Sequence, residues 1–118
     1  MKTKHWFLSF LIIALVALFA APVQAEKKEY EITAYCACKK CCGKWSGGPT
    51  ASGVKPVEGV TVAAPRSIPF HTKIHIEGVG NRVVHDRLAK KYDHRIDVYF
   101  ASHDAALKFG KQKRIVTF

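Results

Sequence analysis

The chain is poor in acidic residues. Of its 118 residues, 9 are Asp or Glu and 19 are Lys or Arg, which gives a formal net charge of +10 at pH 7. In a cytosolic protein such an excess would suggest nucleic acid, but the aromatic and basic interleaving typical of nucleic-acid surfaces is absent. In an exported protein, the same charge suits an anionic wall polymer or lipid headgroups. We therefore expect no nucleic-acid partner.

The chain also lacks internal repeats, low-complexity stretches and a second hydrophobic unit. Residues 26–118 therefore read as a single domain, which we expect to act as a monomer. A domain of this size buries only about 60 to 65% of the surface of its unfolded chain. A local crosslink would consequently make a useful contribution to stability.

The longest apolar run stands at the N-terminus. Lys2 and Lys4 precede an apolar segment over 6–21, and Val23-Gln24-Ala25 supplies the small-residue pattern of a cleavage site. The run falls short of the roughly 20 residues that span a bilayer. We interpret residues 1–25 as a cleaved signal peptide, so that the product is exported to the periplasm or the extracellular cell wall. It would touch the membrane only through an uncleaved signal. Cleavage lowers the net charge from +10 to +8, because the segment carries two lysines and no acid.

Short alternating or apolar segments follow, separated by turn residues. They predict six strands, over 29–35, 60–64, 73–77, 82–86, 96–100 and 113–118. Ser102 as an N-cap and Gly110 as a stop predict one short helix over 103–109. Residues 43–59, rich in Gly, Pro, Ser and Lys, predict a long surface loop. The expected fold class is mainly β, a small six-stranded barrel with one short helix.

Cysteine is confined to one cluster of seven residues, comprising Cys36, Cys38, Cys41 and Cys42. Outside the cytoplasm, two disulfides are the favoured interpretation, with a metal bound by thiolates and free thiols as alternatives. Structural zinc sites usually draw on two separated pairs, which this cluster does not offer. The pairing stays open, although adjacent Cys41 and Cys42 are the least suitable partners. We expect the cysteines to brace the loop rather than to carry out chemistry.

The histidines show no metal-binding pattern. His71, His75, His85 and His94 are isolated on predicted loops and strand faces, without the paired spacing of a zinc-binding helix. We therefore assign no metal site and expect no cofactor.

A charged residue interrupts the most hydrophobic predicted strand. Asp97 stands between Ile96 and Val98, where a carboxylate needs a reason, and Asp86 precedes it by eleven residues. One interpretation is catalytic, because apolar neighbours raise the pKa of a carboxyl group. The other is structural, with Asp97 paired to Arg95 on the same face of the strand.

Several segments together resemble one known family, the three-aspartate (3D) domain family. They are Thr33-Ala34-Tyr35-Cys36, Thr50-Ala51-Ser52-Gly53, Ile68-Pro69 with Thr72-Lys73-Ile74, Glu77-Gly78, Asp86, and the run from Arg95 to His103. The resemblance spans nearly the whole chain after Tyr30. It implies a six-stranded double-psi β-barrel, similar to the catalytic barrel of membrane-bound lytic transglycosylase A and to rare lipoprotein A and expansin barrels.

The resemblance also implies a function, the cleavage of peptidoglycan glycan strands. It places the catalytic carboxylates at Asp97 and Asp86. Substrate-binding positions follow at Thr50, Ser52 and Gly53. Lys90 and Arg95 are further substrate-binding candidates, because the lactyl and peptide carboxylates of such a substrate need cationic partners. Two departures stand out: Ala64 occupies the place of the family's first aspartate, and residues 87–94 replace its glycine-rich loop.

A single carboxyl group is enough for lytic transglycosylation. The protonated acid donates to the glycosidic oxygen, and its conjugate base takes the proton from the sugar's own 6-hydroxyl. Asp97 suits this role, with Asp86 in support. The alternative is a barrel that binds wall glycan without cutting it, as the expansin relatives and Ala64 suggest.

Overall fold

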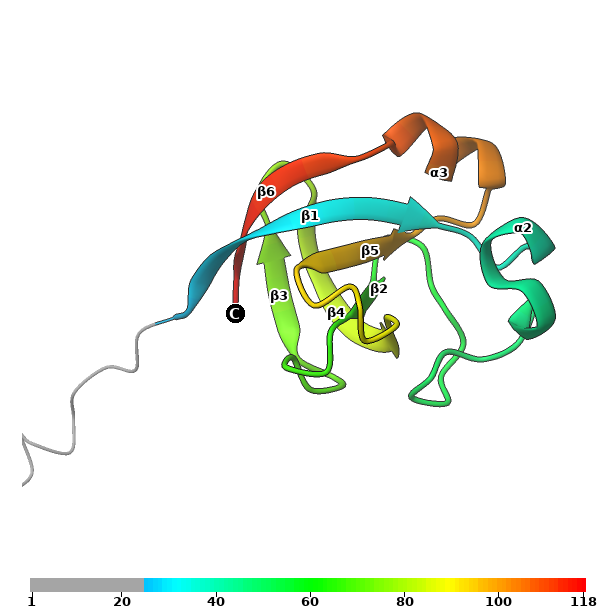
Figure 1. Cartoon of the computed structure of the whole chain (residues 1–118), viewed down its shortest axis with the longest axis horizontal. Helices are drawn as coiled ribbons and strands as arrows, with labels where there is room; N and C mark the ends of the chain where they lie inside the picture. Colours follow the sequence, from blue (N-terminus) through cyan, green and yellow to red (C-terminus); the bar gives the residue numbers. More distant parts are fainter. Residues whose placement is uncertain (1–24) are drawn as a thin grey trace, which may run out of the picture.

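The computed structural model describes residues 25–118, which form a closed barrel of six strands (Figure 1). The strands are β1 (Lys27–Tyr35), β2 (Thr61–Ala64), β3 (Lys73–Ile76), β4 (Gly80–Arg87), β5 (Arg95–Tyr99) and β6 (Gln112–Thr117). The mainly β fold and all six strands are confirmed, each within about two residues of its expected bounds. The double-psi crossing stays a prediction. The signal-peptide interpretation falls almost wholly on residues 1–24, outside the described part.

The helices differ from expectation in one respect. Helix α3 (His103–Phe109) has the predicted bounds, and its N-cap Ser102 accepts a hydrogen bond from the Ala105 N–H. The cysteine segment, for which no helix was predicted, contains α2 (Lys39–Cys42), and a 3₁₀ turn, η1 (Gly43–Trp45), begins the predicted loop. Within residues 25–118, no helix is long and apolar enough to cross a membrane.

The strand order around the barrel is β1-β5-β2-β4-β3-β6, and β6 closes it against β1. Two neighbouring pairs, β1 with β5 and β2 with β4, are parallel, and the other four are antiparallel. Antiparallel β2 and β5 therefore join two parallel pairs, which places segments distant in sequence side by side. The barrel's side chains alternate between its interior and its outer surface.

Aliphatic side chains fill the barrel. The core contains Tyr30, Ile32, Val62, Ala64, Ile68, Ile74, Ile76, Val84, Ile96, Val98 and Val116. Its members on β5 are Ile96 and Val98, so Asp97, which stands between them, points to the other side of the strand.

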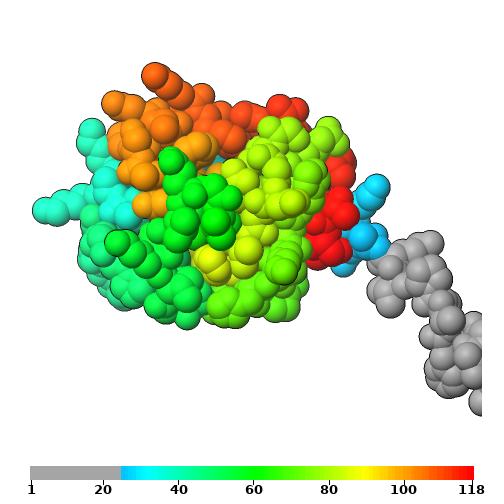
Figure 2. Space-filling model, turned by 180° about the vertical axis from the view of Figure 1, so that it is seen from behind, coloured from blue at the N-terminus to red at the C-terminus, as the bar shows by residue number. Residues whose placement is uncertain are grey.

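The connections gather at one end of the barrel. Helices α2 and α3 lie where β1 and β5 end (Figure 1). From the opposite side, the green loop that follows α2 covers the same end (Figure 2). At the far end, Glu26 pairs with Phe118, and their backbones exchange two hydrogen bonds.

Candidate functional site

The two aspartates share one row of side chains across four strands. Asp97 on β5 is in register with Thr33 on one side and with Ala63 on the other, and Ala63 is in register with Asp86 on β4. Residues in one row of a sheet point to the same face. Two strand spacings place the Cα atoms of Asp86 and Asp97 about 10 Å apart. The fold thus brings the two predicted carboxylates to one face.

A β-bulge is what turns Asp86 toward that face. The pairing of β2 with β4 runs from Val62–Val84 to Ala63–Asp86, so His85 is an extra residue on β4. Without it, Asp86 would follow the alternation of Val84, whose side chain is in the core. Bulges re-aim side chains in this way. The backbone irregularity therefore moves a carboxylate from the core side to the outer side.

Asp97 is half-buried beside a single hydroxyl donor. The Thr33 hydroxyl donates a 3.0 Å hydrogen bond to Oδ1 of Asp97. Burial raises the pKa of Asp97 to about 6, and the negative charge of Asp86 acts in the same direction. The Thr33 hydrogen bond and the positive charge of Arg95 oppose this rise. The carboxyl group can thus hold or release a proton near neutral pH.

Arg95 is engaged elsewhere. Its guanidinium bonds Oε1 of Glu31 through Nε at 2.8 Å and through Nη2 at 2.6 Å, and it lies over the ring of Tyr92. The structural alternative for Asp97, an ion pair with Arg95, is therefore wrong, because the bonded partner of Arg95 is Glu31. The hydrogen bonds also lower the pKa of Glu31.

Asp86 accepts three hydrogen bonds and organises the neighbouring loop. Tyr35 donates its hydroxyl to Oδ2 at 3.0 Å, and the backbone N–H groups of Ala51 and Arg87 donate to Oδ1 at 3.0 and 2.9 Å. Burial and the adjacent Asp86 raise the pKa of Tyr35, so this phenol stays a donor. Asp86 thus holds residue 51 against the barrel.

The loop residues singled out from the sequence lie next to Asp86. The Thr50 hydroxyl donates to the carbonyl of Val54 at 2.7 Å and lies 3.2 Å from the Ser52 hydroxyl. The Ser52 N–H donates to the carbonyl of His85, the bulge residue. Gly53 has φ +92°, a conformation that L side chains rarely adopt. Thr50 is therefore occupied by its own loop, and Ser52 has the freer hydroxyl.

Lys90 lies in the exposed β4–β5 loop. It lines a hollow of about 150 Å³ together with Pro65, Arg66, Ser67, Leu88, Ala89 and Asp93. A larger hollow, of about 430 Å³, is lined mainly by β3 and β4 and contains neither aspartate. The two aspartates, both partly buried, line neither of these hollows.

The two departures from the family pattern meet in space. Ala64 is 0% exposed and belongs to the core, whereas its neighbour Ala63 lies in the aspartate row. Arg87 donates through Nη1 to the carbonyls of Ala64, Pro65 and Ile68 and lies over the Phe70 ring at 4.1 Å. The chain thus fastens this segment with an arginine.

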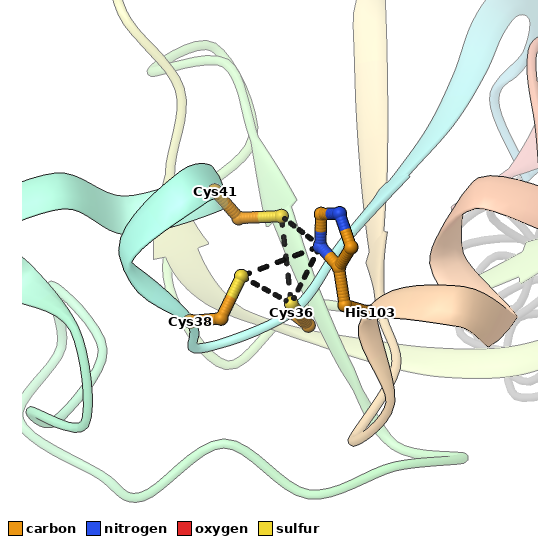
Figure 3. Close-up of side chains that lie close together, drawn as sticks. All are labelled: Cys36, Cys38, Cys41 and His103. Atoms are coloured by element: carbon orange, nitrogen blue, oxygen red, sulfur yellow. Dashed lines mark hydrogen bonds between the residues drawn. The ribbon is translucent and has the colours of Figure 1, made fainter.

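The cysteines are free, and the predicted disulfides are not formed. The Sγ atoms of Cys36 and Cys38 are 3.0 Å apart, well beyond the bond length of about 2.05 Å. Those of Cys36, Cys38 and Cys41 all lie 3.3 to 3.5 Å from Nδ1 of His103 (Figure 3). The cluster therefore includes a histidine.

Sequence reasoning missed His103. It examined four other histidines for zinc-helix spacing and used this one as the start of α3 and as the end of the run from Arg95 that resembles the family. Its separation from the cysteines, 62 residues or more, hides the contact. The usable signal was Cys-x-Cys-x₂-Cys followed by a histidine at a helix start. The fourth cysteine, Cys42, is not part of this group of three thiols and a histidine, because its thiol donates to the Cys36 carbonyl.

Comparison with known proteins gives one informative similarity. No protein-family model matches the chain. In an alignment 85 residues long, which covers 68% of the chain, the sequence is 33% identical to the "Putative cell wall shaping protein YabE" of Bacillus subtilis (strain 168). The chain spans about a fifth of the length of this curated relative, 20%.

Proposed function

We propose that this protein is exported, acts at the cell wall and cleaves peptidoglycan glycan strands by lytic transglycosylation, with Asp97 as the acid and base. The similarity to a protein named for cell wall shaping supports the location. The resemblance to the three-aspartate domain family supports the substrate. Peptidoglycan glycan strands are then its partner.

One observation carries the proposal. Asp97 is a half-buried carboxyl group with a pKa near 6, it bonds only the Thr33 hydroxyl among the described residues, and it lies in the same row as Asp86. An ordinary structural aspartate would have its oxygens bonded to a cation or to backbone N–H groups, as Asp86 has. Asp97 keeps one oxygen for a substrate.

The reaction needs one proton shuttle. Protonated Asp97 donates to the glycosidic oxygen as the bond between that oxygen and the anomeric carbon breaks. The carboxylate then takes the proton from the 6-hydroxyl of the same sugar, whose oxygen bonds the anomeric carbon. The products are an anhydro end and a free hydroxyl end, and Asp97 is again protonated. No water is consumed.

Asp86 plays a supporting part in this scheme. Its charge raises the pKa of Asp97, and the hydrogen bond that it accepts from the Ala51 N–H holds the loop that presents Ser52. Lys90, which is exposed, is available for substrate carboxylates, whereas Arg95 is neutralised by Glu31.

Digestion of purified sacculi tests the proposal. The wild-type protein should release anhydro-ended muropeptides, and Asp97→Asn should lower the release by at least about a hundredfold, since asparagine cannot transfer a proton. Asp93→Asn is the matched control, because Asp93 is an exposed aspartate of the β4–β5 loop. Wild-type cleavage by the Asp97 variant would refute the assignment.

The rival function is a non-catalytic wall-binding barrel. It is favoured by Ala64, which removes one carboxylate of the family pattern, and by the position of the two aspartates outside both hollows. In the same assay, sedimentation of the protein with the sacculi without any release would support this alternative. Release of reducing ends instead of anhydro ends would indicate hydrolysis.

A further inference from the structure

We infer that Cys36, Cys38, Cys41 and His103 bind one Zn²⁺ ion as a structural centre. The four ligand atoms lie within 4.8 Å of one another, on three separate segments: the end of β1, the α2 turn and the start of α3. In Figure 3, three sulfur atoms lie close together on one side of the His103 ring and face one of its nitrogens. This inference corrects the sequence-based view that the chain has no metal site.

The distances match a tetrahedral metal site. Zinc lies about 2.3 Å from thiolate sulfur and about 2.0 to 2.1 Å from imidazole nitrogen, so the edges of its tetrahedron measure about 3.5 to 3.8 Å. The three sulfur-to-nitrogen distances are 3.4, 3.3 and 3.5 Å, and Cys36 Sγ lies 3.0 and 3.5 Å from the other two sulfurs. The sixth edge, between the sulfurs of Cys38 and Cys41, measures at most 4.8 Å. The five shorter edges would lengthen by a few tenths of an ångström to admit the ion, so only a small rearrangement separates this cluster from a bound site.

Disulfide bonding does not account for the arrangement. A disulfide joins two sulfurs, whereas here three sulfurs and a nitrogen converge on one point. Two disulfides would also require Cys42, whose thiol is turned to the Cys36 carbonyl at 3.2 Å. A shared cation explains why His103 joins three thiols and the fourth is left out.

The ligand set selects the metal. Three thiolates and an imidazole in tetrahedral arrangement favour zinc over magnesium or calcium, which prefer oxygen. Four protein ligands close the coordination sphere, as in structural rather than catalytic zinc sites. The bound site would carry a net charge of −1. Lys39 and Lys40, which stand between Cys38 and Cys41, supply neighbouring positive charge.

The surrounding chain needs such a centre. Helix α2 has four residues, none of them buried, and no side-chain cap, so neither packing nor capping accounts for its order. Zinc would tie it to the first residue of α3, across 62 residues of sequence, and fix the end of β1. Tyr35, the donor to Asp86, stands immediately before Cys36. The metal would thus brace the end of the barrel that carries the aspartate row.

Metal analysis of the full exported protein, purified without chelator, tests the inference. We expect about one zinc per chain and a mass, after the metal is removed in acid, that equals the fully reduced chain. Cobalt exchanged into the site should give thiolate charge-transfer bands and the intense visible bands of tetrahedral Co²⁺. Chelation should lower the melting temperature by an amount on the order of 10 °C, because the ion binds only the folded state.

Matched variants locate the ligands. Cys41→Ser should lose the metal while Cys42→Ser, the adjacent thiol outside the cluster, keeps it. His103→Ala should likewise lose it, and His94→Ala, at an exposed histidine, should not. His103→Cys should retain a metal in an all-sulfur site, which keeps the test decisive if the alanine variant fails to fold.

Three results would overturn the inference. They are a protein two or four hydrogens lighter than the reduced chain, reduced thiols without bound metal, and equal metal loss in the Cys41 and Cys42 variants. None of these readouts depends on glycan cleavage.

Discussion

At the residue scale, Asp97 combines a raised pKa with a free carboxylate oxygen. Its proposed role requires the protonated form, whose population falls as pH rises through about 6. We therefore expect the cleavage rate to be highest below pH 6 and to fall about tenfold per unit well above it. Initial rates of muropeptide release between pH 4 and 8.5 measure this. A rate that stays flat across that range would exclude Asp97 as the acid.

The raised pKa of Asp97 also predicts that replacing this residue stabilises the fold at high pH. Replacing an aspartate with a structural role would instead destabilise it. A raised pKa in the folded state means that the stabilisation by the bound proton is present below pH 4 and is lost as pH rises through about 6. Asp97→Asn avoids this loss, so the variant should be more stable than the wild type at pH 8, by up to about 3 kcal/mol. Urea unfolding at pH 4 and pH 8 checks this. A variant less stable at pH 8 would show that the carboxylate is a structural partner.

Asp86 has a different character, because its oxygens are occupied by Tyr35 and two backbone N–H groups. Asp86→Ala leaves these donors unpaired and should lower the free energy of unfolding by about 1 to 3 kcal/mol. Hydrogen exchange at the Ala51 amide should rise most, since that N–H loses its acceptor. Asp93→Ala, at an exposed position, is the control and should leave both measurements unchanged. Unaltered exchange at Ala51 would contradict the organising role of Asp86.

At the element scale, the alternation of β2 determines where the family's missing aspartate, at position 64, would lie. Its residues alternate between the core, at Val62 and Ala64, and the outer row, at Ala63. The lost carboxylate would therefore stand in the barrel interior, beside the carbonyl group that Arg87 binds. Its absence costs the aspartate row no member.

Ala64→Asp tests this view of β2. It places a carboxyl group at a position that is 0% exposed, and we expect a loss of about 3 kcal/mol or more in the free energy of unfolding. It should add no glycan-cleaving activity. Thermal unfolding and the sacculus assay measure both effects, with Leu107→Asp, at an exposed position of α3, as the control. A stable and more active variant would show that the interior carboxylate belongs to the site.

At the scale of the whole molecule, the positive charge of the chain predicts that the proposed binding to the cell wall depends on salt. Residues 26–118 carry a net charge of +8, and charge attraction across solvent weakens as salt shortens the Debye length from about 10 Å at 0.1 M to about 3 Å at 1 M. Binding to sacculi that retain anionic polymers should fall steeply over this range. Sedimentation with sacculi stripped of those polymers is the control and should depend on salt far less. Equal salt dependence would mean that the charge serves another partner.

The sequence by itself determined the strands, the short helix α3 and the outward side of Asp97. Hydrophobic alternation and capping are local properties, so neighbouring residues are enough to read them. The observed bounds of the six strands, close to those expected, follow from this.

Only the tertiary structure decided the composition of the site. The bulge at His85, the pairing of Arg95 with Glu31 and the meeting of His103 with the cysteines all depend on register between distant segments. Register is fixed by the barrel's closure and by its buried face as a whole, so no local pattern contains it. The candidates could be named from their residue types, but their partners could not, because each partner stands more than fifty residues away or depends on one inserted residue.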